Sequence, residues 1–117
     1  MKEDKELDKS EMFIIVEIIE YVPNSVVIKT ILEKTTGNIN AVSFDSGEGF
    51  AEKTSPFDTF IQVIEGKAEI IIDSKPHHLT TGQSIIIPAH TRNLIKANER
   101  FKMISSVIKS GYENIVV

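Results

Sequence analysis

The stretch GEGFAEKTSPFDTFIQVIEG at residues 47–66, followed directly by KAEIIID at residues 67–73, decides the fold. Its apolar runs are rich in isoleucine and valine, and such β-branched residues suit pleated strands better than helices. We interpret Glu65-Gly66, between two of these runs, as a tight hairpin turn in which Gly66 supplies a positive φ. Asp73-Ser74 predicts the same kind of turn one strand later.

Short apolar runs bounded by turn signals recur along the rest of the chain. We expect strands at Ser25–Leu32, Asn40–Phe44, Thr59–Ile64, Lys67–Ile72, Ser84–Ile87, Asn93–Ala97 and Phe101–Ile108. This spacing predicts an all-β sandwich or barrel. The Met12–Tyr21 segment fits a strand and a short helix equally well, because Ser10 is a possible helix cap whereas the isoleucines favour a strand. Pro23 ends the segment in either case.

Length, charge and composition limit the class of protein. The 117 residues suffice for one domain only, and the chain has no cysteine and three histidines. That composition excludes disulfide scaffolds, thiolate zinc sites and cysteine nucleophiles. A formal net charge of -4 argues against nucleic acid or an anionic membrane as the main partner. We interpret residues 1–11 as a mobile polar arm rather than a signal peptide, residues 111–117 as a tail, and the protein as cytoplasmic.

From Phe44 to Ile108 the order of turns resembles the cupin superfamily. The first motif is the stretch at residues 47–66, and the second is GQSIIIPAHTRNLIKA at residues 82–97. The FKMISSVI strand at residues 101–108 is also similar. The resemblance implies a single domain over residues 12–110, a jelly-roll-type double-stranded β-helix barrel of two antiparallel sheets.

A typical cupin holds Fe, Mn, Ni or Zn with two histidines and one carboxylate from its first motif and a third histidine from its second. Aligned on Gly66, the resemblance places the histidine pair at Lys53 and Ser55 and the carboxylate at Thr59. The second motif places its histidine at Asn93. None of these four residues is a good metal ligand, and the ammonium of Lys53 repels a divalent cation at short range. We therefore expect neither a metal nor another cofactor.

The first hypothesis is a metal-free domain that binds a small polar or anionic molecule inside the barrel. Lys53 would replace the charge of the metal and hold a carboxylate or phosphate, with Ser55, Thr59 and Asn93 as hydrogen-bonding walls. The alternative for Lys53 is that its stem carries the charge out to solvent. The alternative for Thr59 and Asn93 is that they satisfy each other or a trapped water.

Two enzyme hypotheses remain beside it. A metal-dependent dioxygenase or isomerase would use relocated ligands at His77, His90 and Asp58. A metal-free enzyme resembling the sugar epimerases of the superfamily would pair His90 with Asp58 as an acid/base dyad. The simpler interpretations are a solvated loop histidine at His90 and a turn residue bonded to its own backbone at Asp58. His77 and His78 face opposite sides of a short strand, so they do not chelate one ion together.

Strand alternation also predicts an outward face. Gln62 shares a face with Phe60 and Ile64, opposite to Thr59, and this composition suits a packed sheet or a contact between subunits. We expect a homodimer in which an apolar N-terminal segment covers a partner or its own sheet edge. The residues expected in the barrel core or at that interface are Phe44, Phe50, Phe57, Phe60, Phe101 and Met103.

Overall fold

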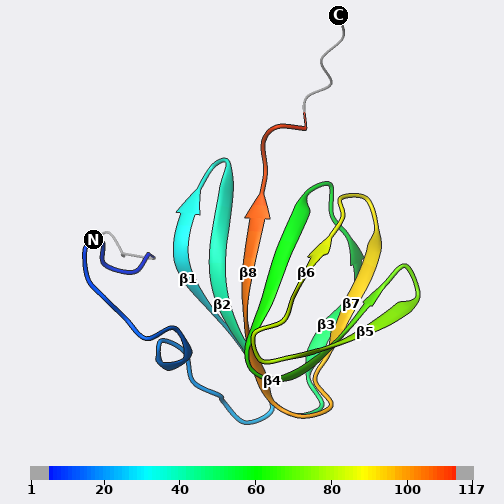
Figure 1. Cartoon of the computed structure of the whole chain (residues 1–117), viewed down its shortest axis with the longest axis horizontal. Helices are drawn as coiled ribbons and strands as arrows, with labels where there is room; N and C mark the ends of the chain where they lie inside the picture. Colours follow the sequence, from blue (N-terminus) through cyan, green and yellow to red (C-terminus); the bar gives the residue numbers. More distant parts are fainter. Residues whose placement is uncertain (1–5, 113–117) are drawn as a thin grey trace, which may run out of the picture.

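A computed structural model describes residues 6–112 of the chain, and within that range it contains eight strands and one 3-10 turn, η1 (Ile15–Glu17) (Figure 1). The strands are β1 (Val26–Lys34), β2 (Gly37–Phe44), β3 (Gly49–Thr54), β4 (Asp58–Ile72), β5 (Lys75–Thr80), β6 (Ser84–Ile87), β7 (Arg92–Lys96) and β8 (Phe101–Ile108). The all-β prediction is confirmed. β3 is absent from the predicted strands, because its exposed residues Ala51–Thr54 carry no apolar alternation.

The strands form two antiparallel layers joined through β4. In sheet A the order is β1-β2-β8-β4-β6, using the first half of β4. In sheet B the order is β3-β7-β4-β5, using the second half of β4. The two layers converge where β4 crosses from one to the other and splay apart at the opposite end (Figure 1). This arrangement confirms the predicted barrel of two packed antiparallel sheets.

The predicted hairpin at Glu65-Gly66 is wrong. The chain continues through these residues as one strand, and its register against β8 shifts between Val63 and Glu65. Gly66 does adopt a positive φ of 90°, and a Cβ there would lie 2.7 Å from the Arg100 carbonyl oxygen. Glycine is therefore needed where β4 passes from sheet A to sheet B, and it makes no hairpin turn.

The second predicted turn is confirmed. Asp73 and Ser74 have φ values of 49° and 70°, and they connect β4 to its antiparallel neighbour β5. Two successive residues with positive φ are the signature of a type I′ hairpin, whose twist matches that of the flanking strands.

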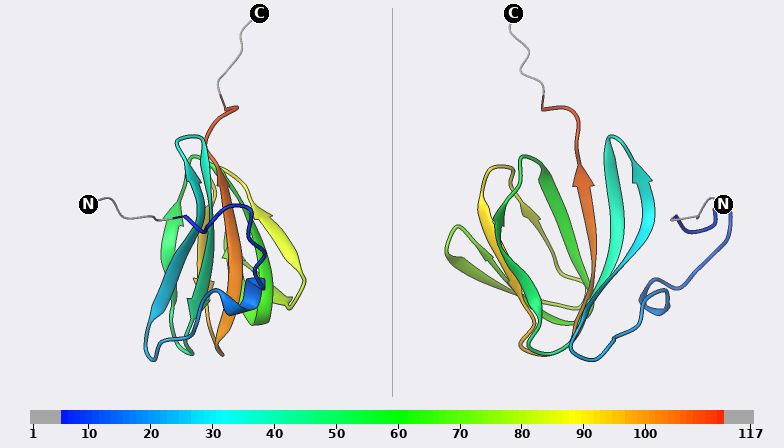
Figure 2. Two further views of the ribbon diagram at one scale, coloured as in Figure 1. Left: turned by 90° about the vertical axis from the view of Figure 1, so that its left-hand side faces the viewer. Right: turned by 180° about the vertical axis from the view of Figure 1, so that it is seen from behind.

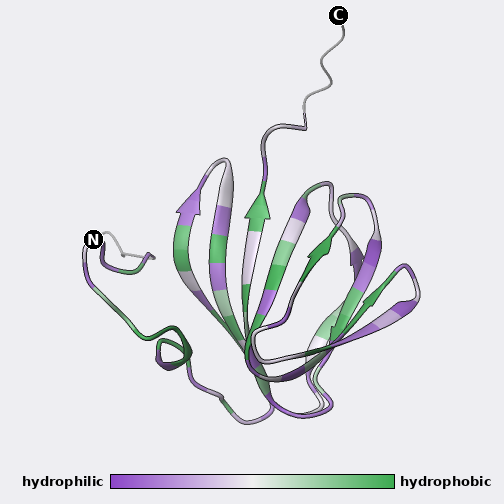
Figure 3. Cartoon of the chain, in the orientation of Figure 1, coloured by the Kyte–Doolittle hydropathy of each residue, from purple (hydrophilic) through white to green (hydrophobic). Residues whose placement is uncertain are grey.

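The core lies between the two sheets at their convergent end. The rings of Phe44 and Phe101 stack with centroids 4.5 Å apart, and Phe50 meets Phe44 edge-on at 5.0 Å. Met103 is buried beside them, whereas Phe60 is 40% exposed on the outward face of sheet A. Hydrophobic and hydrophilic residues alternate along the strands in Figure 3, as the two-residue period of a strand requires.

The Met12–Tyr21 segment is neither a strand nor a regular α-helix. η1 is its single helical turn, and Ser10 does not cap it. Ile19 is only 3% exposed, and the Ser43 hydroxyl donates to the Glu20 carbonyl at 2.9 Å. The segment thus packs along the outer face of sheet A (Figure 2).

The first described residues follow the edge of sheet A. The Leu7 amide donates to the Ile31 carbonyl at 3.1 Å, and the Glu6 carboxylate accepts from the Glu33 amide at 2.7 Å. These bonds cover part of the free edge of β1. Residues 1–5 of the predicted arm and 113–117 of the predicted tail lie outside the described residues, so the domain limits stay predictions.

No helix within residues 6–112 is long and apolar enough to cross a membrane. The cytoplasmic location stays a prediction.

Candidate functional site

A cavity of about 100 Å³ lies between the two sheets. Its described lining residues come from β3, β4, β6, β7, β8 and the β3–β4 connection: Phe50, Lys53, Ser55, Thr59, Ile61, Ile87, Asn93, Ile95, Met103, Ser105 and Val107. All four residues predicted to bind a ligand are among them. Sheet B contributes Lys53 and Asn93, sheet A contributes Thr59, and Ser55 lies in the β3–β4 connection.

Asn93 is the buried polar residue of this cavity. It is 3% exposed, and its Nδ2 donates to the backbone carbonyls of Lys53 and Thr91, each at 3.3 Å. Its Oδ1 is buried and has no hydrogen-bond partner in the described chain. No hydrogen bond joins Asn93 to Thr59 within residues 6–112, so these two residues do not satisfy each other there.

Lys53 is the only charged side chain among the described lining residues. Its Nζ lies 5.2 Å from the centroid of the Phe50 ring, and the side chain is exposed. The ion pairs of residues 6–112 do not include it. The rim of the cavity therefore carries one positive charge that no carboxylate of the described residues neutralises, which favours an anion.

Three hydroxyl groups accompany the amide and the ammonium. The Ser55 Oγ accepts a hydrogen bond from the Phe57 amide at 3.1 Å. Thr59 and Ser105 line the cavity, and their hydroxyls take part in none of the side-chain hydrogen bonds of the described chain. Sequence reasoning missed Ser105, although β8 alternates and Ser105 pairs with the buried Ile61. Aliphatic walls with a few convergent polar groups are the usual composition of a small-molecule pocket.

The structure does not assemble the acid/base dyad. The Asp58 Oδ1 accepts from the Ala89 amide at 2.8 Å, so this carboxylate fastens the neighbouring loop rather than its own turn. His90 is exposed in that loop, has a φ of 63°, and donates its backbone amide to the Ser55 carbonyl at 2.6 Å. No hydrogen bond or ion pair joins the two side chains among the residues described.

The alternative metal ligands are not brought together either. The Nδ1 of His77 lies 3.3 Å from the Ile70 carbonyl oxygen, and His78 lies 3.8 Å from the Glu69 carboxylate. Over residues 6–112, no group of three or more histidine, aspartate or glutamate side chains is placed to hold a metal ion. The expectation that the protein has no metal cofactor itself stays a prediction.

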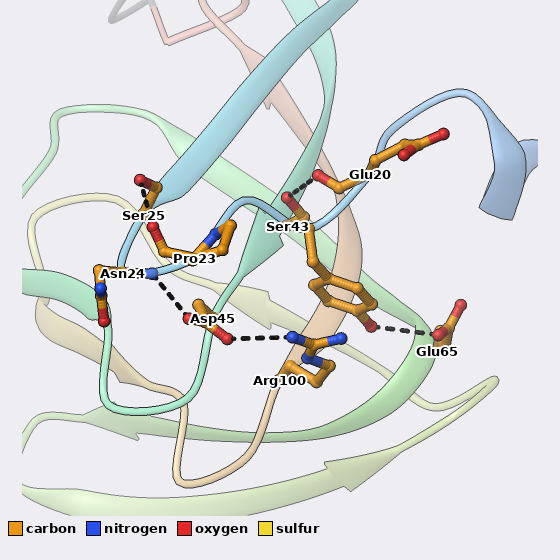
Figure 4. Close-up of polar contacts among 9 residues, drawn as sticks. Glu20, Pro23, Asn24, Ser25, Ser43, Asp45, Glu65 and Arg100 are labelled. Carbon is orange, nitrogen blue, oxygen red and sulfur yellow. Dashed lines mark hydrogen bonds and ion pairs between the residues drawn. The ribbon is translucent and has the colours of Figure 1, made fainter.

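A second polar cluster, which sequence reasoning also missed, lies where the N-terminal segment meets sheet A (Figure 4). The Arg100 guanidinium lies 4.5 Å from the Tyr21 ring centroid and 3.5 Å from the Asp45 carboxylate. The Tyr21 hydroxyl donates to the Glu65 carboxylate at 3.2 Å. Burial and the nearby negative charge of Glu65 raise the pKa of Tyr21 to about 12. The cluster joins residues from four separate parts of the chain.

Lys102 completes this cluster. It is 8% exposed, and its Nζ donates to the Val16 carbonyl at 2.6 Å and lies 3.7 Å from the Glu65 carboxylate. A buried ammonium needs such partners, because desolvation penalises an unpaired charge. The ion pairs of Arg100 with Asp45 and of Lys102 with Glu65, and the Lys102 bond to the Val16 carbonyl, hold the N-terminal segment on sheet A.

The fold is a small β-barrel with a cavity between its two sheets. The sequence model of the family described as "Cupin domain" matches residues 40–105, more than half of the chain. The chain therefore belongs to the cupin family. No protein with a curated description matches it.

Solved structures share this fold. A conserved protein of unknown function, SPY1581, from Streptococcus pyogenes has a TM-score of 0.85 at 24% identity, covering 94% of this chain and 96% of that one. A cupin superfamily protein from Desulfitobacterium hafniense DCB-2 has a TM-score of 0.81 at 23% identity, covering 94% and 100%. A cupin 2 conserved barrel domain protein from Leptotrichia buccalis has a TM-score of 0.77 at 27% identity, covering 80% of this chain and 46% of that one.

The predicted homodimer stays a prediction. The outward face of β4, β6 and β8 carries the exposed apolar side chains Phe60, Ile86 and Ile108. The Ser43 hydroxyl and the Lys102 ammonium donate to the Glu20 and Val16 carbonyls, so the N-terminal segment packs on its own sheet.

Proposed function

We propose that this cupin domain binds a small polar or anionic molecule inside its barrel, without a metal ion. The observation that carries the proposal is the meeting of Lys53, Ser55, Thr59 and Asn93 around one cavity between the sheets. The Asn93 amide and the hydroxyl-bearing residues Ser55, Thr59 and Ser105 line a space walled by aliphatic side chains, with the exposed Lys53 beside them. Such a site orients a ligand through its polar groups and excludes water through its apolar walls.

The charge of the site supports binding without a metal. In the alignment with typical cupins, the positions of the metal ligands are those of Lys53, Ser55, Thr59 and Asn93. A positive side chain at one of these positions takes over the attraction for an anion that the metal provides elsewhere in the family. The enzyme hypotheses have less support, because Asp58 binds a loop amide and His90 stays exposed.

The proposal is tested by NMR on the full isotopically labelled chain, with metal content measured on the same preparation. Carboxylates, phosphate esters and polyols are titrated separately. We expect at least one class to shift the amide signals of Lys53, Thr59 and Asn93. Failure of all three classes to do so would contradict the proposal, as would a stoichiometric transition metal in the purified protein.

Two serines of β8 give a matched pair of variants. Ser105→Leu fills the cavity, whereas Ser106→Leu adds the same side chain at the neighbouring position, which pairs with the outward Phe60. Binding should be lost in the first variant and kept in the second. If Ser105→Leu does not fold, Thr59→Val removes a lining hydroxyl while keeping the shape of the side chain. Equal binding by the wild type and each folded cavity variant would place the ligand elsewhere.

A further inference from the structure

We infer that the ligand of this cavity is a small 2-hydroxycarboxylate, an acid with a hydroxyl group on the carbon next to its carboxylate. This inference rests on the proposed function and names its ligand class. Four observations support it. They are the size of the cavity, the charge of Lys53, the buried Asn93 Oδ1 without a partner in the described chain, and the position of these two residues opposite each other.

Size excludes most metabolite classes. The cavity of about 100 Å³ is well below the roughly 300–1,000 Å³ of sites for drug-sized molecules. It has room for several waters, and therefore for a ligand of only a few non-hydrogen atoms. Nucleotides and sugar phosphates are too large to be enclosed, whereas an acid of about two to four carbon atoms fits this size range.

Charge selects an anion. Lys53 is the only charged side chain among the described lining residues, and it forms no ion pair within residues 6–112. A carboxylate at the rim would gain a charge-assisted hydrogen bond from its Nζ. A free amino acid is disfavoured, since its ammonium group would lie near Lys53 with no lining carboxylate to hold it.

The unpaired acceptor requires a donor on the ligand. Both hydrogen bonds of the Asn93 amide nitrogen go to backbone carbonyls, so its donor side is in use. Its Oδ1 is buried with no partner in the described chain. A buried acceptor without a partner is costly, and a ligand hydroxyl would satisfy it. A simple carboxylate has no donor to offer at neutral pH.

The strand register places the positive charge of Lys53 and the unpaired acceptor of Asn93 on neighbouring residues. Lys53 and Asn93 are direct partners across the β3–β7 pair, and both line the cavity. Side chains directly opposite each other on one face of antiparallel strands start about 4.5–5.5 Å apart at Cβ. A carboxylate and a hydroxyl on adjacent carbons reach two such neighbours together. The alkyl end then faces the apolar walls formed by Ile61, Ile95 and Met103.

The test compares five probes of similar size on the full chain by NMR titration: lactate, propionate, lactamide, alanine and inorganic phosphate. Propionate lacks the donor, lactamide lacks the charge, and alanine replaces the hydroxyl with an ammonium. We expect lactate to bind at least about tenfold more tightly than propionate, the difference that one hydrogen bond to a buried group supports. Lactamide, alanine and phosphate should also bind more weakly than lactate.

Variants test the contact of the carboxylate with Lys53 and that of the hydroxyl with Asn93. Lys53→Met should weaken lactate binding about five- to tenfold, and the loss should shrink at high salt. Lys67→Met, which removes an exposed lysine of β4 that does not line the cavity, is the matched control and should bind as the wild type does. Asn93→Leu should abolish the preference for lactate over propionate while leaving propionate binding nearly unchanged. A purely structural role for Asn93 would weaken both acids equally.

The outcomes separate this inference from the proposed function. Equal binding of lactate and propionate by the wild type would overturn the hydroxyl contact, whether or not Asn93→Leu folds. Tighter binding of phosphate or a polyol, lost in Ser105→Leu, would overturn the ligand class and leave the cavity as the binding site. If no probe and no member of the broader screen binds, both proposals fail.

Discussion

Asn93 lies directly opposite Lys53 across the β3–β7 pair, and its side-chain amide donates to the Lys53 backbone carbonyl at 3.3 Å while its own Oδ1 has no partner in the described chain. One residue therefore ties two strands of sheet B together and leaves a buried acceptor unsatisfied. Two long hydrogen bonds stabilise the fold, and the orphan oxygen offsets much of that gain.

This balance predicts a small effect of Asn93→Leu on the ligand-free protein. We expect the free energy of unfolding to change by less than about 1 kcal/mol, since the lost hydrogen bonds and the removed orphan acceptor act in opposite directions. Ile95→Ala, at a buried position of the same strand, should cost about 2–4 kcal/mol and serves as the comparison. Urea denaturation measures both. A loss from Asn93→Leu as large as that from Ile95→Ala would contradict the balance.

The passage of β4 between the sheets predicts a strong effect at Gly66. Gly66→Ala forces a residue with a Cβ into φ 90° and places that Cβ 2.7 Å from the Arg100 carbonyl oxygen. Gly82 has nearly the same φ, 91°, but nothing within 4 Å of the corresponding point. Both variants store backbone strain of about 1–3 kcal/mol, and only Gly66→Ala adds a collision with backbone. We expect its loss of unfolding free energy to exceed that of Gly82→Ala by at least about 1 kcal/mol, measured by urea denaturation.

The fold could be predicted because alternation and turn residues are local signals. The error at Glu65-Gly66 has a local cause as well. A glycine with positive φ is required both in a hairpin turn and where a strand changes sheets, so the residue type alone does not distinguish them. Only the pairing of both halves of β4, with β8 on one side and β7 on the other, decides it.

The candidate site, too, could be predicted from the sequence only in part. The resemblance placed Lys53, Ser55, Thr59 and Asn93 by their spacing from Gly66, Gly82 and Pro88, which does not depend on whether Gly66 forms a turn, and all four line one cavity. Contacts between distant segments left no such signal. Tyr21 and Glu65 are 44 positions apart, and Asp58 and Ala89 are 31 apart, so nothing local indicates that they meet.

Acid should weaken the hydrogen bonds that attach residues 6–24 to sheet A at their two ends, through Glu6 and through Asn24. The Asn24 amide donates to the Asp45 carboxylate at 2.7 Å and, with the Ser46 amide and Arg100, holds the pKa of Asp45 below its usual 3.8. The Glu33 amide, with two lysines, lowers the pKa of Glu6 to about 2. Lowered values mean that these carboxylates stabilise the fold above about pH 4, and that this contribution is lost as the pH falls through the folded-state values.

We therefore expect Asp45→Asn to reduce the slope of stability against pH below about pH 4, measured by urea denaturation at a series of pH values. The variant starts less stable at neutral pH, because a neutral amide accepts more weakly from the Asn24 amide and does not pair with Arg100. Glu99→Gln removes an exposed carboxylate that forms no ion pair within residues 6–112 and controls for the change in net charge. Parallel pH profiles for Asp45→Asn and the wild type would refute the linkage.

At alkaline pH the same linkage applies to Tyr21, whose pKa is raised by folding rather than lowered. Its pKa is raised from 10.0 to about 12, first by burial and then by the Glu65 carboxylate, so the folded state favours the protonated phenol. The stabilising contribution is complete below about pH 10 and is lost as the pH rises towards 12. Tyr21→Phe should flatten this alkaline decline relative to the wild type. Denaturation profiles from pH 9 to 12, followed together with tyrosinate absorbance, measure the effect, and an unchanged decline in Tyr21→Phe would show that another group causes it.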